Sequence, residues 1–338
     1  MILRSDTLQM LLHISLTIIY VFCTSDAFEE TISVPIANIT EPDTYLCYTV
    51  PVEKLKRGSI VGYKVSTTKN VAHHVAIAIL EEYSTNSTFW NCRRQQGRIG
   101  KKKLIALTGK EGFQNEHSEY DFPEDIGIEL GKETGMKYIL IQVHYKDISR
   151  DEDLLYSTVN VTFKLTEERR PYLMQKLMLV SLGYIPPQST FSSEIAIRWT
   201  GQTIHPFNYY MHTHDYGLMA EGYVIKKGKV FLIGSHKVTG HANPIYKIDE
   251  PVVIEHGDIF AARCIYRNNE TFPVKFGVRN QDEMCNVAVD FKYAVDDSLS
   301  YPLAIVQYQS AQNSTWCSDV IPGTKALCDY INDMANNM

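Results

Sequence analysis

Three short stretches place histidines where they could bind a metal ion. "MHTHDYG" carries His212 and His214, "AHHVAIAIL" carries the adjacent His73 and His74, and "IQVHY" carries His144. Imidazole binds zinc, copper, iron and nickel, so the residue type indicates a transition metal without naming it. Against this, an H-x-H pair occurs by chance in many chains. A single strand histidine such as His144 is more often a hydrogen-bonded core residue.

Strand geometry decides which of these histidines can share one ion. Residues i and i+2 of a β-strand project from the same face, so His212 and His214 point the same way. His73 and His74 are neighbours, and on a regular strand they point to opposite faces. Both can reach one ion only where the strand ends or bulges.

The motifs of common hydrolases are absent from the sequence. It contains no H-E-x-x-H and no G-x-S-x-G nucleophile elbow. No cysteine pair has zinc-knuckle spacing. Enzyme chemistry, if present, is not indicated by those motifs.

The histidines lie within or at the ends of segments with strand-like alternation of apolar and polar residues. Such segments recur along the chain and predict an all-β protein built as a sandwich or barrel. They cover 59–65, 73–80, 137–145, 157–165, 194–200, 251–266 and 286–295. "GYVIKKGKVFLIGS" predicts a hairpin that turns at Lys227 and Gly228. The charged stretch "LTEERRP" predicts a boundary between domains at 28–168 and 169–338.

The start of the chain predicts a secreted protein. Residues 1–27 combine an early arginine, an apolar run and the small residues Ser25 and Ala27 at the −3 and −1 positions, the pattern of a signal peptide. No later stretch reaches the ~18 apolar residues of a membrane span, so no anchor is expected in the mature chain. The 44% hydrophobic composition is that of a globular protein, and the net charge of −6 argues against nucleic-acid binding.

Cysteines and glycosylation sequons fit the secretory compartment. Loss of the signal peptide removes Cys23 and leaves an even number of cysteines, which favours disulfides, although six cysteines allow 15 pairings. They are Cys47, Cys92, Cys264, Cys285, Cys317 and Cys328. N-x-[ST] sequons are expected on exposed loops if they are used. They begin at Asn38, Asn86, Asn160, Asn269 and Asn313.

Five stretches in a fixed order give the chain a specific resemblance. They are "HHVAIAIL", "GKETGMKYILIQVHYKDIS", "HPFNYYMHTHDYG", "GDIFAARC" and "DEMCN". Together they resemble the peptidylglycine α-hydroxylating monooxygenases of the copper type II, ascorbate-dependent family. The resemblance runs from about Thr44 to Tyr293. It implies two antiparallel, jelly-roll-like β-sandwich domains with one copper site each.

The resemblance also implies the copper ligands. Three imidazoles would hold the first copper, which transfers electrons, and two imidazoles with a thioether would hold the second, where O₂ reacts. The ligands are His73, His74 and His144 at the first site, and His212, His214 and Met284 at the second. A soft thioether favours Cu(I), which suits a site that binds O₂. Gln142 matches a family position too, on the same strand face as His144, and would support that ligand.

Two disulfides and a reaction follow from the same resemblance. Cys47 would pair with Cys92 and Cys264 with Cys285, which leaves Cys317 and Cys328 to pair in the tail. The implied reaction uses ascorbate and O₂ to hydroxylate the α-carbon of a C-terminal glycine, the first step of peptide amidation. Many relatives carry a lyase domain that cleaves the product. Here a monofunctional enzyme and a separate lyase are expected.

The substrate positions depart from the family pattern. Tyr45 and Asn286 match its substrate contacts, but Tyr210 replaces the arginine that grips the peptide carboxylate. Ala288 and Asp290 replace a tyrosine and a methionine. A phenol cannot reproduce a bidentate arginine–carboxylate pair. Arg279 could substitute for the arginine. Tyr210 shares a strand face with His212, which predicts that it determines specificity.

Three functions remain possible on these residues. Loss of the arginine and gain of Asp290 would favour a cationic amine, the substrate class of the related dopamine and tyramine β-monooxygenases. The peptidylglycine interpretation is favoured because the matches around both copper sites are closer to that branch. A secreted copper-binding protein without activity would need neither two separate sites nor a methionine placed for O₂ chemistry.

Overall fold

A computed structural model gives the architecture of most of the mature chain. The described residues are 27–35, 39, 44–55, 58–67, 72–82, 87–92, 104–111, 117–130, 134–145, 158–237, 245–277, 282–294 and 306–310. For 73, 74, 104–111, 117 and 306–310 only the backbone is described. The predicted signal peptide (apart from Ala27), the Cys317–Cys328 pair, Arg279 and the sequons at Asn38, Asn86 and Asn313 lie outside these residues.

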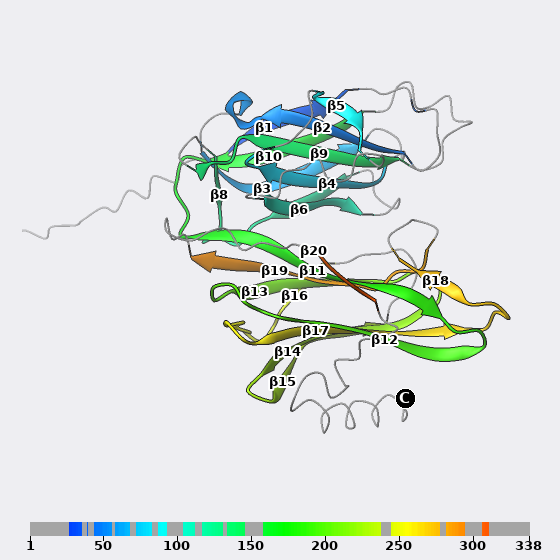
Figure 1. Cartoon of the computed structure of the whole chain (residues 1–338). Coiled ribbons are helices and arrows are strands. Elements are labelled where there is room, and N and C mark those ends of the chain that lie inside the picture. The colour runs from blue at the N-terminus through cyan, green and yellow to red at the C-terminus, as the bar shows by residue number, and fades with distance from the viewer. Residues whose placement is uncertain are drawn as a thin grey trace, which may run out of the picture.

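The first ten strands form two facing sheets, here called the N-terminal sandwich (Figure 1). One sheet has the order β1-β10-β3-β7, with β8 also paired to β3, and the other has the order β5-β2-β9-β4-β6. A 3-10 turn, η1 (Val52–Lys54), follows β2. The strands are β1 (Phe28–Val34), β2 (Tyr45–Pro51), β3 (Gly58–Thr67), β4 (Ala72–Leu80), β5 (Phe89–Asn91), β6 (Leu104–Glu111), β7 (His117–Asp121), β8 (Ile128–Leu130), β9 (Tyr138–Tyr145) and β10 (Val159–Thr166).

The remaining strands form the C-terminal sandwich. Its first sheet has the order β16-β13-β19-β11-β18, with β20 added in parallel to β11, and its second has the order β12-β17-β14-β15. The strands are β11 (Tyr172–Ile185), β12 (Ser189–Arg198), β13 (His205–His212), β14 (Gly217–Lys226), β15 (Lys229–Lys237), β16 (Tyr246–Lys247), β17 (Ile259–Asn268), β18 (Val274–Phe276), β19 (Asn286–Ala294) and β20 (Val306–Ser310). The all-β, two-sandwich prediction is confirmed, and apart from β20 the described strands pair antiparallel with their neighbours in each sheet.

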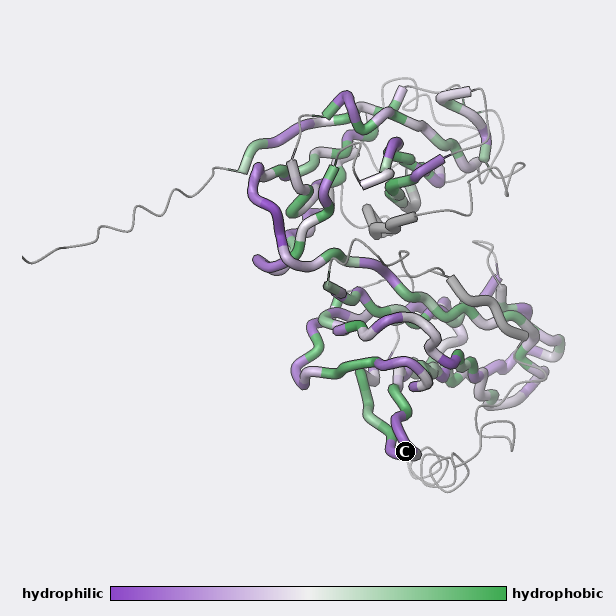
Figure 2. The backbone as a smooth tube through the Cα atoms, turned by 60° about the vertical axis from the view of Figure 1, so that its left-hand side comes forward, coloured by the Kyte–Doolittle hydropathy of each residue, from purple (hydrophilic) through white to green (hydrophobic). Residues whose placement is uncertain are grey.

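Alternation of side chains builds one core inside each sandwich. Along β10, Val159, Val161, Phe163 and Leu165 point inward while the residues between them are partly exposed. Apolar and polar segments alternate in this way along the strands of both sandwiches (Figure 2). β-Branched and aromatic residues fit this half-buried, pleated surface, which explains why these segments form strands.

The predicted hairpin joins β14 to β15. Lys226 pairs with Lys229, and both turn residues, Lys227 (φ 49°) and Gly228 (φ 75°), have positive φ. Two positive φ values are the mark of a type I′ turn, whose twist matches that of the flanking strands. The glycine is needed because side chains rarely adopt this backbone conformation.

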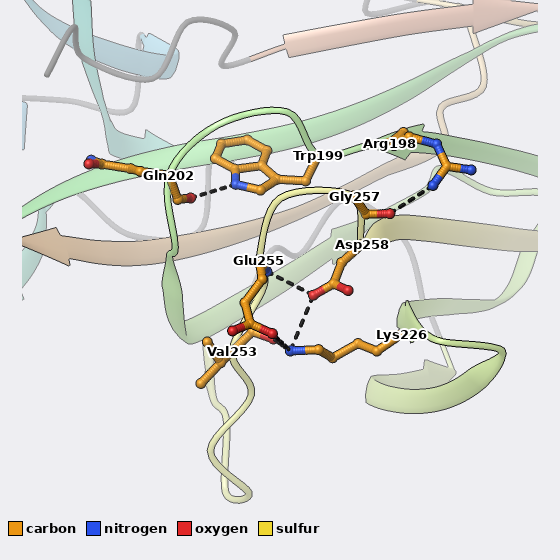
Figure 3. A network of polar contacts seen from close by, with 8 residues as sticks. All are labelled: Arg198, Trp199, Gln202, Lys226, Val253, Glu255, Gly257 and Asp258. Atoms are coloured by element: carbon orange, nitrogen blue, oxygen red, sulfur yellow. Dashed lines mark hydrogen bonds and ion pairs between the residues drawn. The ribbon is translucent and has the colours of Figure 1, made fainter.

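A polar network closes the turn that leads into β17 (Figure 3). The Lys226 Nζ lies 3.0 Å from Glu255 Oε2 and 3.2 Å from Asp258 Oδ2, and Arg198 donates a 2.8 Å hydrogen bond to the Gly257 carbonyl. Gly257 has φ +92°, which again favours glycine. The network fixes the entry of a strand that carries one cysteine of a disulfide.

The two sandwiches contact each other beside the segment that connects β10 to β11. Tyr172 accepts a 3.0 Å backbone hydrogen bond from Gly127 and donates a 3.2 Å one to Asp125. The Asp125 carboxylate also pairs with Lys292 of β19. Met174 of β11 is buried in the core of the N-terminal sandwich. The face of the β13-β19-β11 sheet that carries Met174 and Lys292 therefore looks toward the N-terminal sandwich.

Two sequons fall on described residues, and one departs from expectation. Asn269 is exposed and directly follows β17, whereas Asn160 lies within the central strand β10, half-buried, rather than on a loop. Alternation explains this, because Val159 and Val161 on either side of Asn160 face the core. In the described part of the chain, no helix has the length and apolar character needed to cross a membrane.

Candidate functional site

The backbone around the first histidine group contains the irregularity that adjacent ligands require. β4 pairs with β9 so that His74 stands opposite His144 and Ala72 opposite Tyr145, with a register shift between Ala72 and His74. His73 is therefore the extra residue of β4, and a bulge re-aims side chains at such a point. The side chains of His73 and His74 are outside the described set, so their role as ligands stays a prediction.

The His144 ring packs against a tyrosine of the neighbouring strand β2. Tyr45, its partner on β2, stacks on the imidazole with ring centroids 3.9 Å apart and planes 12° from parallel. His144 is 2% exposed. Gln142 lies two residues earlier on the same face, where its Nε2 is 3.5 Å from Cys92 Sγ and 3.8 Å from Cys47 Sγ. Tyr45 thus orients the imidazole, while Gln142 contacts the disulfide.

That disulfide joins Cys47 to Cys92, and a second joins Cys264 to Cys285. These are the two pairs that the family resemblance implied. Cys47 stands opposite Gln142 in the sheet. The first bridge therefore lies one row of residues from His144, on the same sheet face.

His212 and His214 come together at the end of β13. Tyr209 and Met211 point into the core of the C-terminal sandwich, so Tyr210 and His212 project from the opposite face, toward the N-terminal sandwich. His214 follows the end of the strand, and its ring lies edge-on to that of His212 with centroids 4.8 Å apart. The two imidazoles are close enough to bind one ion.

Met284 reaches this site from the segment before β19. Asn286, the first residue of β19, stands opposite His212 on β13, and its Nδ2 lies 3.5 Å from Met284 Sδ. Tyr266 donates a 2.7 Å hydrogen bond to the Met284 carbonyl. Cys285, the next residue, is bridged to β17. Three long-range constraints therefore place the half-buried Met284 beside the histidine pair.

A residue that sequence reasoning missed, Glu283, connects the two segments of this site, the one after β13 and the one before β19. Its buried carboxylate accepts hydrogen bonds from the backbone N–H of His214, of Tyr216 (2.8 Å) and of Met284 (2.8 Å). Burial raises the pKa of Glu283, and these three donors oppose the shift. The motif "DEMCN" contains the residue, but its contact with the segment 214–216 depends on the fold.

Two of the predicted substrate positions, Tyr210 and Asp290, belong to one cluster of polar side chains on the same sheet face. The Asp290 carboxylate pairs with Lys176 Nζ at 2.9 Å and accepts a 3.0 Å hydrogen bond from the Tyr120 hydroxyl of the N-terminal sandwich. The Lys176 ammonium also lies 3.7 Å from the centroid of the Tyr210 ring. Because Lys176 balances its charge, Asp290 gives no reason to expect a cationic amine. Sequence reasoning missed both Lys176 and Tyr120.

The donors at the second site fit copper. Two imidazoles and one thioether form a mixed set in which the soft sulfur favours Cu(I). Among the side chains that the structure describes, no three histidine, cysteine, aspartate or glutamate residues gather around one point. The role of Met284 as the third donor stays a prediction.

Comparison with known proteins agrees with this geometry. Residues 30–152 match the N-terminal domain, and residues 173–312 the C-terminal domain, of the family described as copper type II ascorbate-dependent monooxygenase. The family uses copper, ascorbate and O₂. Together the two matches cover most of both sandwiches.

Individual relatives come from two enzyme types. The chain is 29% identical to peptidyl-glycine alpha-amidating monooxygenase B of Xenopus laevis over 92% of this chain and 34% of that protein. It is 27% identical to peptidylglycine alpha-amidating monooxygenase of Rattus norvegicus over 82% and 28%. Dopamine beta-hydroxylase of Rattus norvegicus is 23% identical over 75% and 45%. This chain spans about a third of the length of the amidating relatives. The chain belongs to the copper type II ascorbate-dependent monooxygenase family.

Proposed function

We propose that the chain is a copper- and ascorbate-dependent monooxygenase that hydroxylates the α-carbon of a C-terminal glycine in peptides. The observation that supports this proposal is the edge-on pair of His212 and His214, together with Asn286, the strand partner of His212, whose Nδ2 lies 3.5 Å from Met284 Sδ. Met284 is positioned by a disulfide, by the buried carboxylate of Glu283 and by the register of β13 and β19. A protein that only carries copper would not need a thioether positioned in this way.

Each residue has a separate task in this proposal. The imidazoles of His73, His74 and His144 hold one copper, and His212, His214 and Met284 hold the other. Copper at these sites would supply the one-electron redox chemistry that ascorbate and O₂ require. Tyr45 fixes the ring of His144, and Glu283 holds the segments of the second site together. Rigid positioning of this kind is the protein's contribution to cofactor chemistry.

The reaction balances with two electrons from ascorbate. One oxygen atom of O₂ enters the C–H bond of the glycine α-carbon, and the other leaves as water after taking two protons. The product, a peptidyl-α-hydroxyglycine, must then be cleaved by a lyase activity, on this or another polypeptide, to give the amide. The predicted signal peptide and the two disulfides support a place in the secretory pathway.

A peptide substrate is favoured over an amine by the charge around Asp290. The carboxylate is 2% exposed and is neutralised by Lys176, so it cannot attract an amine as a free anion would. The amine remains the second candidate because dopamine beta-hydroxylase is also a relative.

A competition assay between a peptide and an amine substrate distinguishes these functions. The copper-loaded protein should consume O₂ with ascorbate and hydroxylate a glycine-extended peptide in preference to tyramine when both are offered together. His212→Ala should abolish turnover, because it removes a ligand and therefore the chemical step rather than substrate binding. Preference for tyramine would establish the amine function, and copper binding without turnover of either would leave only the carrier.

A further inference from the structure

The second sheet of the C-terminal sandwich carries buried residues on both of its faces. Phe260 and Ala262 of β17 point into the core, so Ile259, Ala261 and Arg263 point away from it. In the described part of the chain this sheet is the outermost layer of the C-terminal sandwich (Figure 1). Ile259, Ala261 and Arg263 are nevertheless buried. We call the side of the sheet on which they lie the outer face.

Strand register arranges the apolar residues of the outer face in two rows. One row runs from Ala196 on β12 through Ala261 on β17 to Tyr223 on β14. In the next row Ile259 stands beside Ile225. Tyr223, Ile225, Ile259 and Ala261 pack together as a small cluster separate from the core of the sandwich. The two alanines lie side by side, and such small side chains allow another segment to approach the sheet closely.

A row of buried charges borders the apolar rows. The Arg263 Nε lies 2.9 Å from Glu221 Oε2, and its Nη1 lies 3.9 Å from Glu194 Oε1. Charged side chains on the outside of a sheet are normally in contact with water, because removal of an ion from water costs free energy. Arg263, Glu194 and Glu221 are only 2%, 5% and 8% exposed. The outer face is therefore covered and not solvated.

The cover belongs to the same chain, because these residues are buried within a single copy of it. The N-terminal sandwich lies on the opposite side of the first sheet (Figure 1). The connection 238–244 starts after Lys237, which pairs with Met219 at the far end of the β14–β15 hairpin from Ile225. The connection 295–305 joins β19 to β20, and both are strands of the first sheet. These positions leave residues 311–338 as the segment that can reach the outer face.

Residues 311–338 follow a strand that ends beside the covered sheet. β20 runs parallel to β11, ends with Ser310 opposite Leu182, and also lies beside β12, the edge strand of the second sheet. A chain of this length can extend over about 90 Å. Four strands span only about 15 Å at their usual spacing. Reach therefore sets no limit.

The sequence after Ser310 also supplies an apolar surface. Within 325–334, four apolar residues have the i, i+3, i+4, i+7 spacing of one helix face, with polar residues between them. We call them the apolar stripe: Leu327, Tyr330, Ile331 and Met334. An isolated helix as short as this is marginal in water, so its formation needs a surface to pack on.

We propose that residues 311–338 cover the outer face, with the apolar stripe packed against the rows of Ala261 and Ile259. The inner face of β17 carries Cys264, which is bridged to Cys285, and Tyr266, which donates to the Met284 carbonyl. The cover thus stabilises the strand that positions the predicted thioether of the second site. The proposal does not depend on which substrate the protein hydroxylates.

Hydroxyl-radical footprinting of the copper-free protein tests this, because it measures the solvent exposure of individual tyrosines. In the native protein Tyr223 should be labelled as slowly as the buried Tyr266, and far more slowly than the exposed Tyr184. Ile331→Asp places a charge in the apolar stripe and should raise the labelling of Tyr223 several-fold. Asn332→Asp adds the same charge on the polar side of the same turn and is the matched control. Deletion of 311–338 should act like Ile331→Asp.

Three results would overturn the proposal. Tyr223 may be labelled in the native protein as fast as Tyr184, in which case the outer face is open. Protection of Tyr223 that survives deletion of 311–338 would mean that another segment covers the face. Protection that is lost on dilution would identify a second copy of the chain as the cover.

A milder variant keeps the test decisive if the fold is lost. Labelling of Tyr266 together with Tyr223 in Ile331→Asp would indicate general unfolding of the C-terminal sandwich. Leu327→Ala removes part of the apolar stripe without adding a charge, and it should raise the labelling of Tyr223 while Tyr266 stays protected. If it leaves Tyr223 as protected as in the native protein, the stripe does not pack there and the proposal is wrong.

Discussion

The two histidine regions differ in the contacts that hold their parts together. His144 meets the register position of His74 because β4 and β9 are neighbours in one sheet, and Tyr45 joins from the strand on the other side. His214 and Met284 lie just beyond the end of the β13–β19 pairing, whose last partners are His212 and Asn286. Glu283, the Cys264–Cys285 bridge and Tyr266 hold the two chain ends in place there. We therefore expect the second region to be the more sensitive to single changes outside its ligands.

Glu283→Ala should have the largest effect on stability. If it does not, the second region is not the more sensitive of the two. One buried and two partly buried N–H donors lose their acceptor, at ~1–3 kcal/mol each, so the free energy of unfolding should fall by about 4 kcal/mol. Copper affinity at the second site should fall at least tenfold while the first site is unchanged. Denaturant unfolding and copper titration against a chelator measure both.

Two matched variants sharpen the result for Glu283. Glu283→Gln keeps a carbonyl acceptor and should lose less than Glu283→Ala. Glu119→Ala removes an exposed carboxylate paired with Lys164 and should change the unfolding free energy by ~0.5 kcal/mol or less. Equal copper affinity of Glu283→Ala and native protein at the second site would show that Met284 is positioned without the carboxylate.

Removal of each disulfide should separate stability from copper binding. The Cys47–Cys92 bridge spans 45 residues and the Cys264–Cys285 bridge spans 21, so chain entropy predicts losses of about 4 and about 3 kcal/mol. Removal of the Cys264–Cys285 bridge should cost less stability, yet it should cause the greater defect in copper binding at the second site, because Cys285 adjoins Met284. The variants Cys47→Ser/Cys92→Ser and Cys264→Ser/Cys285→Ser are compared by urea unfolding and by the sulfur signal in copper X-ray absorption. A normal sulfur signal in Cys264→Ser/Cys285→Ser would contradict it.

Tyr120→Phe should loosen the contact between the sandwiches. The phenol donates to a buried carboxylate and accepts from Asn208, so its loss should cost about 2 kcal/mol. Hydrogen exchange should rise at β7 and at β19 together, which a defect confined to one sandwich would not produce. Tyr184→Phe, on an exposed tyrosine, is the control. Exchange that rises in β7 alone would argue against a role in joining the two halves.

Tyr45→Ala should have the smallest effect, confined to the first site. Stacked aromatic pairs contribute ~0.5–1.5 kcal/mol, so copper affinity there should fall by about tenfold at most. Tyr45→Phe keeps the ring over His144 and should behave like the native protein. A similar loss in both variants would mean that the hydroxyl, and not the stack, supports His144.

Local patterns predicted the all-β architecture and the turn at Lys227 and Gly228, whereas the ordered motifs, through the family resemblance, implied two sandwiches and both disulfides that the structure describes. Alternation of apolar residues depends on local geometry with a period of two, so it can be read without knowing which strands pair. The side-by-side placement of His212 and His214 follows from the same period.

Tertiary structure alone decided what surrounds those residues. Glu283, Lys176 and Tyr120 carry no local signal, because each acts through a partner brought near by strand register or by the meeting of two sandwiches. The interpretation of the Asp290 charge changed for the same reason. In the sequence it is an added negative charge, whereas in the fold it is one half of a buried, neutral pair. Charge near a site is a sum over neighbours, and the neighbours are set by pairings between strands far apart in the chain.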